Sequence, residues 1–287
     1  MKEKNGAVLS DNPWVEAFRR LRKNKIAVAG FAVFLIICLA CIFAPLLTNW
    51  TYYSIDVDNT MARPSSVHLF GTDSLGRDVF TRILYGGRMT LRVAFTSTIL
   101  AALAGSIIGL AAGYFGGIVD FILSPFLDII ASIPVILLVL VTEAILGWGR
   151  GYYMYAMAIA ATPQFARLIR ASAMNVMGCE YIEAAKALGA SHFGIMSRHV
   201  LHNIASPLIV RFTSGLAEAV LTCTIMGYLG VYINPPTPEL GVIVFIARKY
   251  IRQNPHLTII PCIVIAICVI SISLFGDGLR DALDPRE

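Results

Sequence analysis

Long apolar runs alternate with polar stretches along the chain, and six of the runs are long enough to cross a membrane. A bilayer core about 30 Å thick takes roughly 20 helical residues. A segment in lipid must also satisfy its own backbone hydrogen bonds, which favours helices. The pattern therefore predicts an all-α integral membrane fold with about six transmembrane helices. The fourth is the weakest, because Pro163 and Gln164 interrupt it. The predicted helices cover residues 26–47, 91–113, 121–146, 152–170, 204–230 and 257–276.

The remaining segments divide the chain around a membrane core. The loop after the first helix is rich in Pro, Ser, Asp and Asn, and it ends in a short helix expected from Asp78 to Arg88. The core contains one polar segment, at residues 175–203. The predicted divisions are the N-terminal tail 1–25, the first helix 26–47, the loop 48–90, the core 91–276 and the C-terminal tail 277–287.

The composition supports lipid as the main solvent of this chain. Apolar residues make up 57% of it and charged residues 14%, with a mean hydropathy of +0.71. A soluble domain averages about 25% charged residues, so the polar surface here is too small to cover a globule in water. The first apolar run is long enough to span and is followed by no good cleavage site, so we do not expect a cleaved signal peptide.

The basic residues predict the orientation of the chain in the membrane. Seven Lys and Arg residues precede the first apolar run, and such a cluster stays in the cytoplasm. Six crossings then return the C-terminus to the cytoplasm. Residues 164–203 fall inside as well, whereas 48–90, 147–151 and 231–256 fall outside. The net charge of +5 thus reflects orientation and predicts no nucleic-acid partner.

Several motifs of enzymes and metal sites are missing from the sequence. It has no GxxxxGK[ST] loop, so no P-loop site for ATP is expected, and it has no HExxH or GxSxG signature. Cys38 and Cys41 form a CxxC pair, but inside a spanning segment with no histidine or carboxylate nearby. The five histidines lie in loops or near helix ends. We therefore expect no metal and no cofactor in this chain.

The polar segment at residues 179–203 is the most informative part of the sequence. Residues 180–188 favour a helix in which Ile182, Ala185 and Leu188 form an apolar stripe. Gly189 ends this helix, because glycine tolerates the left-handed conformation of a sharp turn. A second short helix is expected through residues 193–196. The resulting helix–turn–helix knob suits a rigid docking element, and the alternative is an ordinary solvated loop.

The same segment resembles a known signature. Glu183-Ala184-Ala185, followed after three residues by Gly189, is similar to the EAA motif of binding-protein-dependent ABC importer permeases. That motif usually closes with Leu-Pro, whereas His202 follows Leu201 here. Five further segments resemble the C-type permeases of the peptide/nickel subfamily: Leu69–Arg88, Ala112–Asp120, Ala166–Arg170, Pro235–Pro238 and Gly276–Arg286.

This resemblance implies a type I ABC importer permease, with no catalytic residue of its own, in the inner membrane of a bacterium or archaeon. The implied partners are a homologous but different permease, two cytoplasmic ATPases that bind ATP and Mg²⁺, an external binding protein and membrane lipid. The knob would couple the pore to the ATPases. The residues expected in that contact are Ile182, Glu183, Ala184, Ala185, Leu188, Gly189, Phe193 and Ile195.

A few ionisable residues fall at membrane depth, where they usually face partners or water. Arg211 and Glu218 lie seven residues apart on one helical face, and we expect them, with the thiol of Cys223, near a pore or a subunit interface. Asp128 is expected to have a structural role. Glu143 is the remaining carboxylate of this kind.

The cargo expected from the resemblance is a peptide, with nickel or a metal chelate as the alternative. Two other classes of function compete with the ABC importer. An ion-coupled secondary transporter would need coupling-ion sites at broken helices near the midplane, and acidic residues are few here. A membrane enzyme would need one of the missing motifs.

Overall fold

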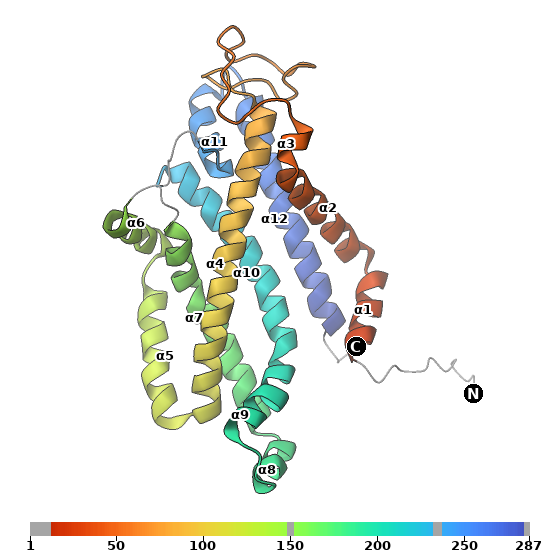
Figure 1. The fold of residues 1–287 in the computed structure, drawn as a ribbon, viewed down its shortest axis with the longest axis vertical. Helices are drawn as coiled ribbons and strands as arrows, with labels where there is room; N and C mark the ends of the chain where they lie inside the picture. The colour runs from red at the N-terminus through yellow and green to blue at the C-terminus, as the bar shows by residue number, and fades with distance from the viewer. Residues whose placement is uncertain (1–12, 148–151, 232–236, 284–287) are drawn as a thin grey trace, which may run out of the picture.

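The computed structural model describes residues 13–147, 152–231 and 237–283, which form a bundle of helices without a β-strand (Figure 1). Expectations for residues 1–12, 148–151, 232–236 and 284–287, including Pro235 and Pro236, lie outside the described residues. The helices are α1 (Pro13–Lys23), α2 (Lys25–Ile42), α3 (Ala44–Leu47), α4 (Val79–Phe115), α5 (Gly117–Ser132), α6 (Val135–Leu146), α7 (Tyr153–Met177), α8 (Glu180–Ala187), α9 (His192–Ile195), α10 (Leu201–Leu229), α11 (Leu240–Ala247) and α12 (His256–Leu283).

The helices long and apolar enough to cross a membrane number four among the described residues, or five if one bent pair counts as a single span. They are α2, α4, the continuous stretch from α9 through α10, and α12, and the bent pair is α5 and α6. Helix α7 has 25 residues but is not among them. The all-α membrane fold is confirmed, whereas the number of six spans and the cytoplasmic location of the termini stay predictions.

A short external helix at residues 78–88 and a separate span at 91–113 were expected, but the two form one helix, α4. It runs without a break for 37 residues, from Val79 to Phe115. Its first turn is capped by Asp78, whose carboxylate accepts a hydrogen bond from the backbone N–H of Thr81 at 2.7 Å. Farther along, Arg88 donates to the carbonyl oxygens of Cys41 and Ile42 at 2.8 and 2.7 Å. The arginine thus binds the end of α2 rather than ending its own helix.

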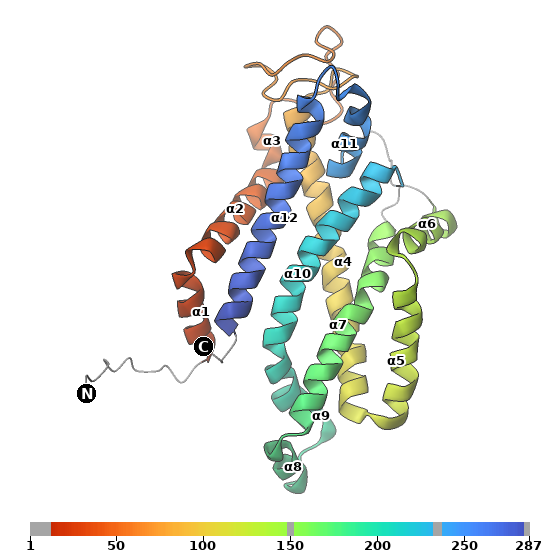
Figure 2. The same ribbon diagram turned by 180° about the vertical axis from the view of Figure 1, so that it is seen from behind.

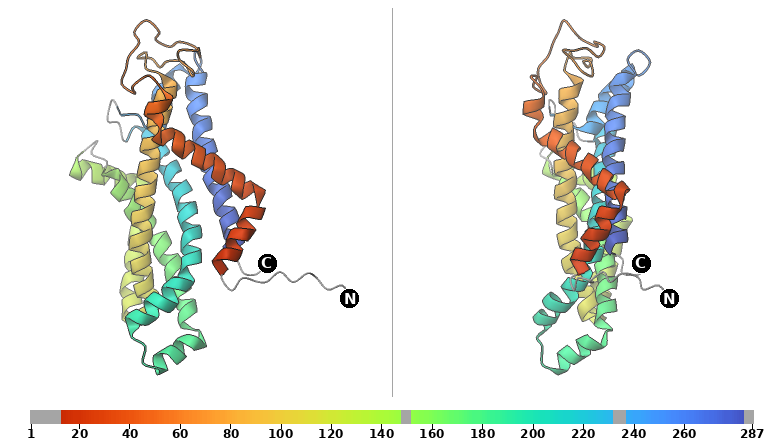
Figure 3. Two further views of the ribbon diagram at one scale, coloured as in Figure 1. Left: turned by 45° about the vertical axis from the view of Figure 1, so that its right-hand side comes forward. Right: turned by 90° about the vertical axis from the view of Figure 1, so that its right-hand side faces the viewer.

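The span expected at residues 121–146 is wrong as a single helix. The chain turns by 87° between α5 and α6, at Ser132-Ile133-Pro134. A proline disfavours the helical conformation of the residue before it, and Ile133 is extended with φ −85° and ψ 120°. Helix α6 consequently projects sideways from the bundle (Figures 1 and 3).

Helix α7 continues through Pro163, where the sequence predicted an interruption. Its two arginines, which lower its hydropathy, are paired with aspartates of α5. Arg167 binds Asp128 at 2.7 Å, in agreement with the structural role expected for that aspartate, and Arg170 binds Asp120 through two nitrogens. The ion pairs explain how a helix of moderate hydropathy packs in this bundle.

Helices α4 and α7 approach closely along a row of glycines. Gly105, Gly109 and Gly113 are spaced four residues apart on α4 and face α7. A Cβ at Gly109 would lie 2.3 Å from the carbonyl oxygen of Ala166. Small residues at this spacing let two membrane helices approach to backbone contact, so these glycines set the distance between α4 and α7.

The loop before α4 covers the end of the bundle opposite α8 and α9 (Figure 1). Its residues 49–78 contain no helix, as expected, and the loop is held by buried charges. His68 is buried and its Nδ1 lies 2.9 Å from Asp78, while Asp73 pairs with Arg77 at 2.7 Å.

At the same end, the stretch expected as an external loop at 231–256 contains the buried helix α11. Its Leu240 and Ile243 pack with residues of α4 and α12.

Helices α2 and α12 lie side by side (Figure 2), with the rings of Phe31 and Phe275 4.9 Å apart. The N-terminal tail contains helix α1. It lies beside the last turns of α12 (Figure 3), which extend to Leu283 rather than ending near residue 276. Both described ends of the chain therefore lie toward the same end of the bundle as α8 and α9.

Candidate functional site

The predicted knob is present at one end of the bundle, where α8 lies beyond the other helices and α9 lies level with the ends of α4 and α5 (Figures 1 and 2). Helix α8 ends at Ala187, and Gly189 follows with φ +83°, the left-handed conformation expected for it. Ser191 then caps α9 by accepting a hydrogen bond from the N–H of Gly194 at 3.2 Å. The second helix continues through a π-helical turn at Met196–Val200 into α10.

A buried apolar cluster fixes the knob to the membrane helices. Ile182 of α8 and Ile195 of α9 are fully buried with Ile169 of α7 and Ile204 of α10. The hydroxyl of Tyr114, near the end of α4, lies 2.7 Å from Nδ1 of His192. Contacts with three long helices allow a displacement of the knob to be transmitted to the bundle.

The exposed side of the knob differs from the predicted stripe. Leu188 is 89% exposed and Phe193 is 77% exposed, whereas Ile182 is buried and Ala185 is half-buried. The three stripe residues therefore do not share one buried face. Helix α8 ends before Leu188, so that side chain leaves the face that Ile182 occupies. Glu183 and Ala184 are exposed as well.

The chain leaves the knob through the start of α10, where His202 stands in place of the proline that usually closes the EAA motif. His202 is exposed and lies inside α10, without a break in the helix. A proline at this position is not needed for the observed path.

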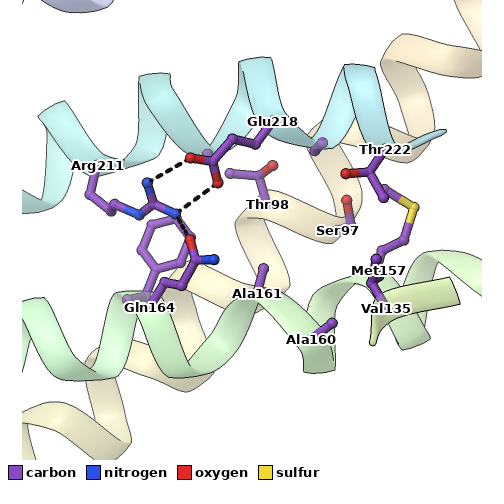
Figure 4. Close-up of a pocket in the computed structure, with 13 residues that line it drawn as sticks. Ser97, Thr98, Val135, Met157, Ala160, Ala161, Gln164, Arg211, Glu218 and Thr222 are labelled. Carbon is purple, nitrogen blue, oxygen red and sulfur yellow. Dashed lines mark hydrogen bonds and ion pairs between the residues drawn. The ribbon is translucent and has the colours of Figure 1, made fainter. Parts of the chain in front are cut away.

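A second polar feature lies at membrane depth, where α10, α7 and α4 line an open cavity of about 130 Å³ (Figure 4). Arg211 and Glu218 line it from one face of α10, as expected, and they form an ion pair with nitrogen–oxygen distances of 3.2 and 2.9 Å. The same guanidinium donates to the amide oxygen of Gln164 on α7 and lies over the ring of Phe165, 5.4 Å from its centroid. These contacts hold the cation against the cavity wall.

Cys223 does not line this cavity, which corrects its expected position near a pore face. Its thiol is buried in the core of the chain, 3.9 Å from the carboxylate of Glu239. Glu239 caps α11 and also accepts a hydrogen bond from Thr90 of α4 at 2.8 Å. Glu143, another buried carboxylate, accepts one from the N–H of Tyr153 at 2.9 Å. These groups tie helices together.

The sequence did not single out the polar residues that complete the cavity. Ser97 and Thr98 on α4 and Thr222 on α10 contribute hydroxyl groups, and Gln164 contributes its amide. Gln164 was noted only as an interruption of an apolar run. The other polar residues of the helix gave no signal for the cavity, because Arg167 and Arg170 pair with α5 instead.

The match to a known family covers most of the membrane core. Residues 105–287 fit the family described as the binding-protein-dependent transport system inner membrane component. The chain belongs to this permease family. Residues 12–64 of the permease also match the N-terminal transmembrane domain of oligopeptide transport permease C, which agrees with the C-type resemblance of the sequence.

Similar permeases match along almost the whole chain. A dipeptide transport system permease protein of Alkalihalophilus pseudofirmus is 40% identical over 275 residues, which cover 96% of this permease and 90% of that protein. A glutathione transport system permease protein of Pectobacterium atrosepticum is 37% identical over 275 residues, with 96% and 91% covered.

Solved structures support the fold. The inward-facing MetNI methionine ABC transporter contains a chain that matches with a TM-score of 0.57 and 23% identity, over 71% of this permease and 97% of that chain. An amino acid ABC transporter matches with a TM-score of 0.52 and 18% identity, over 70% and 94%. At these identities the likeness shows a shared fold only.

Proposed function

We propose that this permease forms one half of the translocation pathway of an ATP-driven importer for peptides, which an external binding protein delivers. The other half would be a homologous but different permease, and two cytoplasmic ATPases would bind and hydrolyse ATP with Mg²⁺. The complex would lie in the inner membrane of a bacterium or archaeon. The observation that carries this proposal is the knob, a compact protrusion fixed to three long helices and exposing two large apolar side chains.

The exposed side chains support a docking role for the knob. Leu188 and Phe193 would each expose apolar surface to water if nothing covered them, and contiguous exposed apolar surface marks interaction sites. Glu183 and Ala184 lie on the same small element. An ATPase groove that covers this surface would move the knob when the ATPases close, and the cluster around Ile182 and Ile195 would pass the movement to α7 and α10.

The proposal of a peptide cargo is based on the relatives, which are named for dipeptide and glutathione transport. Nickel is the alternative that the subfamily resemblance left open. Among the described residues, no group of three or more His, Cys, Asp or Glu side chains could hold a metal ion, so no observation of this chain favours a metal cargo.

Deletion of this chain from its native cell tests the proposal. Uptake of radiolabelled dipeptides and tripeptides should be lost and should return when the gene is supplied again. Uptake of radiolabelled nickel should be unchanged. Loss of nickel uptake with intact peptide uptake would contradict the peptide cargo. Transport that survives depletion of ATP while the ion gradient is held would contradict the ATP-driven importer.

A further inference from the structure

Glu218 and Asp128 both carry exposed carboxylates within the membrane core, but of the two only Glu218 lines the cavity between α4, α7 and α10. The Glu218 side chain is 56% exposed, and it lies well inside the spanning stretch His192–Leu229. A carboxylate at this depth is strongly disfavoured against lipid and usually faces a partner or a water-filled cavity. The face of α10 that carries Glu218 therefore belongs to the polar interior of the assembled transporter or to a contact between its subunits.

The guanidinium of Arg211, beside Glu218, is held in place by several contacts. Arg211 is 17% exposed, donates to both oxygens of Glu218 and to Gln164, and lies over Phe165. The carboxylate is the more exposed member of the pair drawn in Figure 4, and each of its oxygens has further lone pairs to accept hydrogen bonds. The pair fixes Glu218 in position and leaves a hydrogen-bond acceptor facing the cavity.

A second observation is a hydroxyl group in the cavity wall that has no hydrogen-bond partner among the described residues. Thr98 is 2% exposed and lines the cavity, and among the described residues its hydroxyl oxygen has no hydrogen-bond partner. Buried hydroxyl groups are normally satisfied. Thr222 and Ser97 add oxygens to the same wall. The cavity volume of about 130 Å³ exceeds the roughly 10–15 Å³ that a single water molecule needs, so the cavity has room for a small polar group.

We propose that Glu218, with Thr98, forms a subsite for an ammonium group of the cargo as it passes through the permease. An ammonium group brings three N–H donors and a positive charge, which match a carboxylate and neighbouring hydroxyl oxygens. This inference rests on the peptide cargo proposed above. The ammonium group can come from the N-terminus of a peptide or from a lysine side chain.

The experiment uses the complete importer in proteoliposomes, with its binding protein, and compares variants of this chain. Two peptides distinguish the sources: Ala-Ala-Ala carries only the α-ammonium group, and N-acetyl-Ala-Lys-Ala carries only the side-chain ammonium group. Each variant is compared with the wild type for the same peptide, so the selectivity of the binding protein cancels. Uptake of Ala-Ala-Ala should fall about tenfold in Glu218→Gln, because a hydrogen bond to a full charge is lost. A parallel fall for the lysine peptide would show that the subsite takes either source.

A charge swap separates a subsite from a merely structural ion pair. Arg211→Glu combined with Glu218→Arg keeps an ion pair at the same spacing but puts the cation in the exposed position. Uptake of Ala-Ala-Ala should stay low in the swap, and Thr98→Val should reduce it without altering the charge. Asp128→Asn is the matched control: it removes an exposed carboxylate from the Asp128–Arg167 pair outside the cavity, and it should transport at the wild-type rate. Co-purification of the partner permease checks assembly.

Four results would overturn the subsite. The first is wild-type uptake of Ala-Ala-Ala by Glu218→Gln, and the second is restored uptake in the charge swap, which would assign the pair to structure or to contact with the partner permease. If Glu218→Gln fails to assemble, the outcome for Thr98→Val decides, and normal uptake by that variant rejects the subsite. A wild-type complex that imports neither peptide refutes the peptide cargo itself, and the subsite with it.

Discussion

The glycine row between α4 and α7 gives a prediction whose size follows from the structure. Replacing Gly109 by alanine adds a Cβ that would lie 2.3 Å from the carbonyl oxygen of Ala166 and 3.0 Å from its Cα. Ordinary contacts begin at 3.4 Å, and 3.4 minus 2.3 leaves 1.1 Å by which α4 and α7 must separate at this level. The clashing atoms belong to backbone, so no side-chain rotation relieves them.

Two opposing effects set the magnitude for Gly109→Ala. Overpacking a tight contact costs up to about 3 kcal/mol, while alanine favours a helix over glycine by about 1 kcal/mol. The overpacking wins, and a net loss of about 2 kcal/mol remains. For a chain of this size the loss corresponds to a melting temperature lower by about 4–8 °C.

The assay is thermal unfolding of the detergent-solubilised permease in complex with its partner. Gly178→Ala is the control, because this glycine has φ −80° and a Cβ there would meet its nearest atom at an ordinary 3.6 Å. A Gly109→Ala protein that melts no lower than the wild type would refute close packing of α4 on α7.

Other predictions concern orientation, strain and buried polar contacts. A cysteine at Ser65 should react with an impermeant thiol reagent in intact cells and one at Ser191 should not, and labelling of Ser191 would reverse the proposed orientation. Gly189→Val should impair transport although the permease is made and assembles. A residue with a Cβ is strained by about 1–2 kcal/mol at the backbone angle φ +83° of this position. Normal transport by this variant would show that the turn is dispensable. Glu239→Ala should lower the melting temperature, because it leaves the Thr90 hydroxyl and the Val242 N–H without their acceptor. Each lost hydrogen bond should cost about 1–3 kcal/mol. An unchanged melting temperature would count against the buried cap of α11.

The features that depend on local pattern were predicted well. Apolar runs of spanning length predicted the membrane parts of α2, α4, α10 and α12, because the requirement for internal hydrogen bonds in lipid is local to each segment. The helix ending before Gly189 and the position of Arg211 and Glu218 on one helical face also follow from local rules, namely the left-handed turn and the helical repeat. Both are confirmed by the geometry.

The errors arose where another part of the chain decides the conformation. The eight residues of α11 are too few to span a membrane and were placed in an external loop, but α4 and α12 bury them. Thr98 and Gln164 reach the cavity from two helices whose packing partners the sequence does not reveal. The bend before α6 did have a local signal in Pro134, which was outweighed by the continuous apolar run around it.

The central claim is that the knob of α8 and α9 is the docking element for the ATPases. The most direct test is co-purification of the ATPases with the permease when Leu188 is changed to aspartate. Leu188 is 89% exposed, so its replacement should leave the fold and the partner permease in place. Val57→Asp is the matched control, at a residue 76% exposed in the loop at the opposite end of the bundle. The account predicts that Leu188→Asp loses the ATPases and Val57→Asp retains them. Full retention of the ATPases by Leu188→Asp, with normal ATP hydrolysis stimulated by the binding protein, would contradict it.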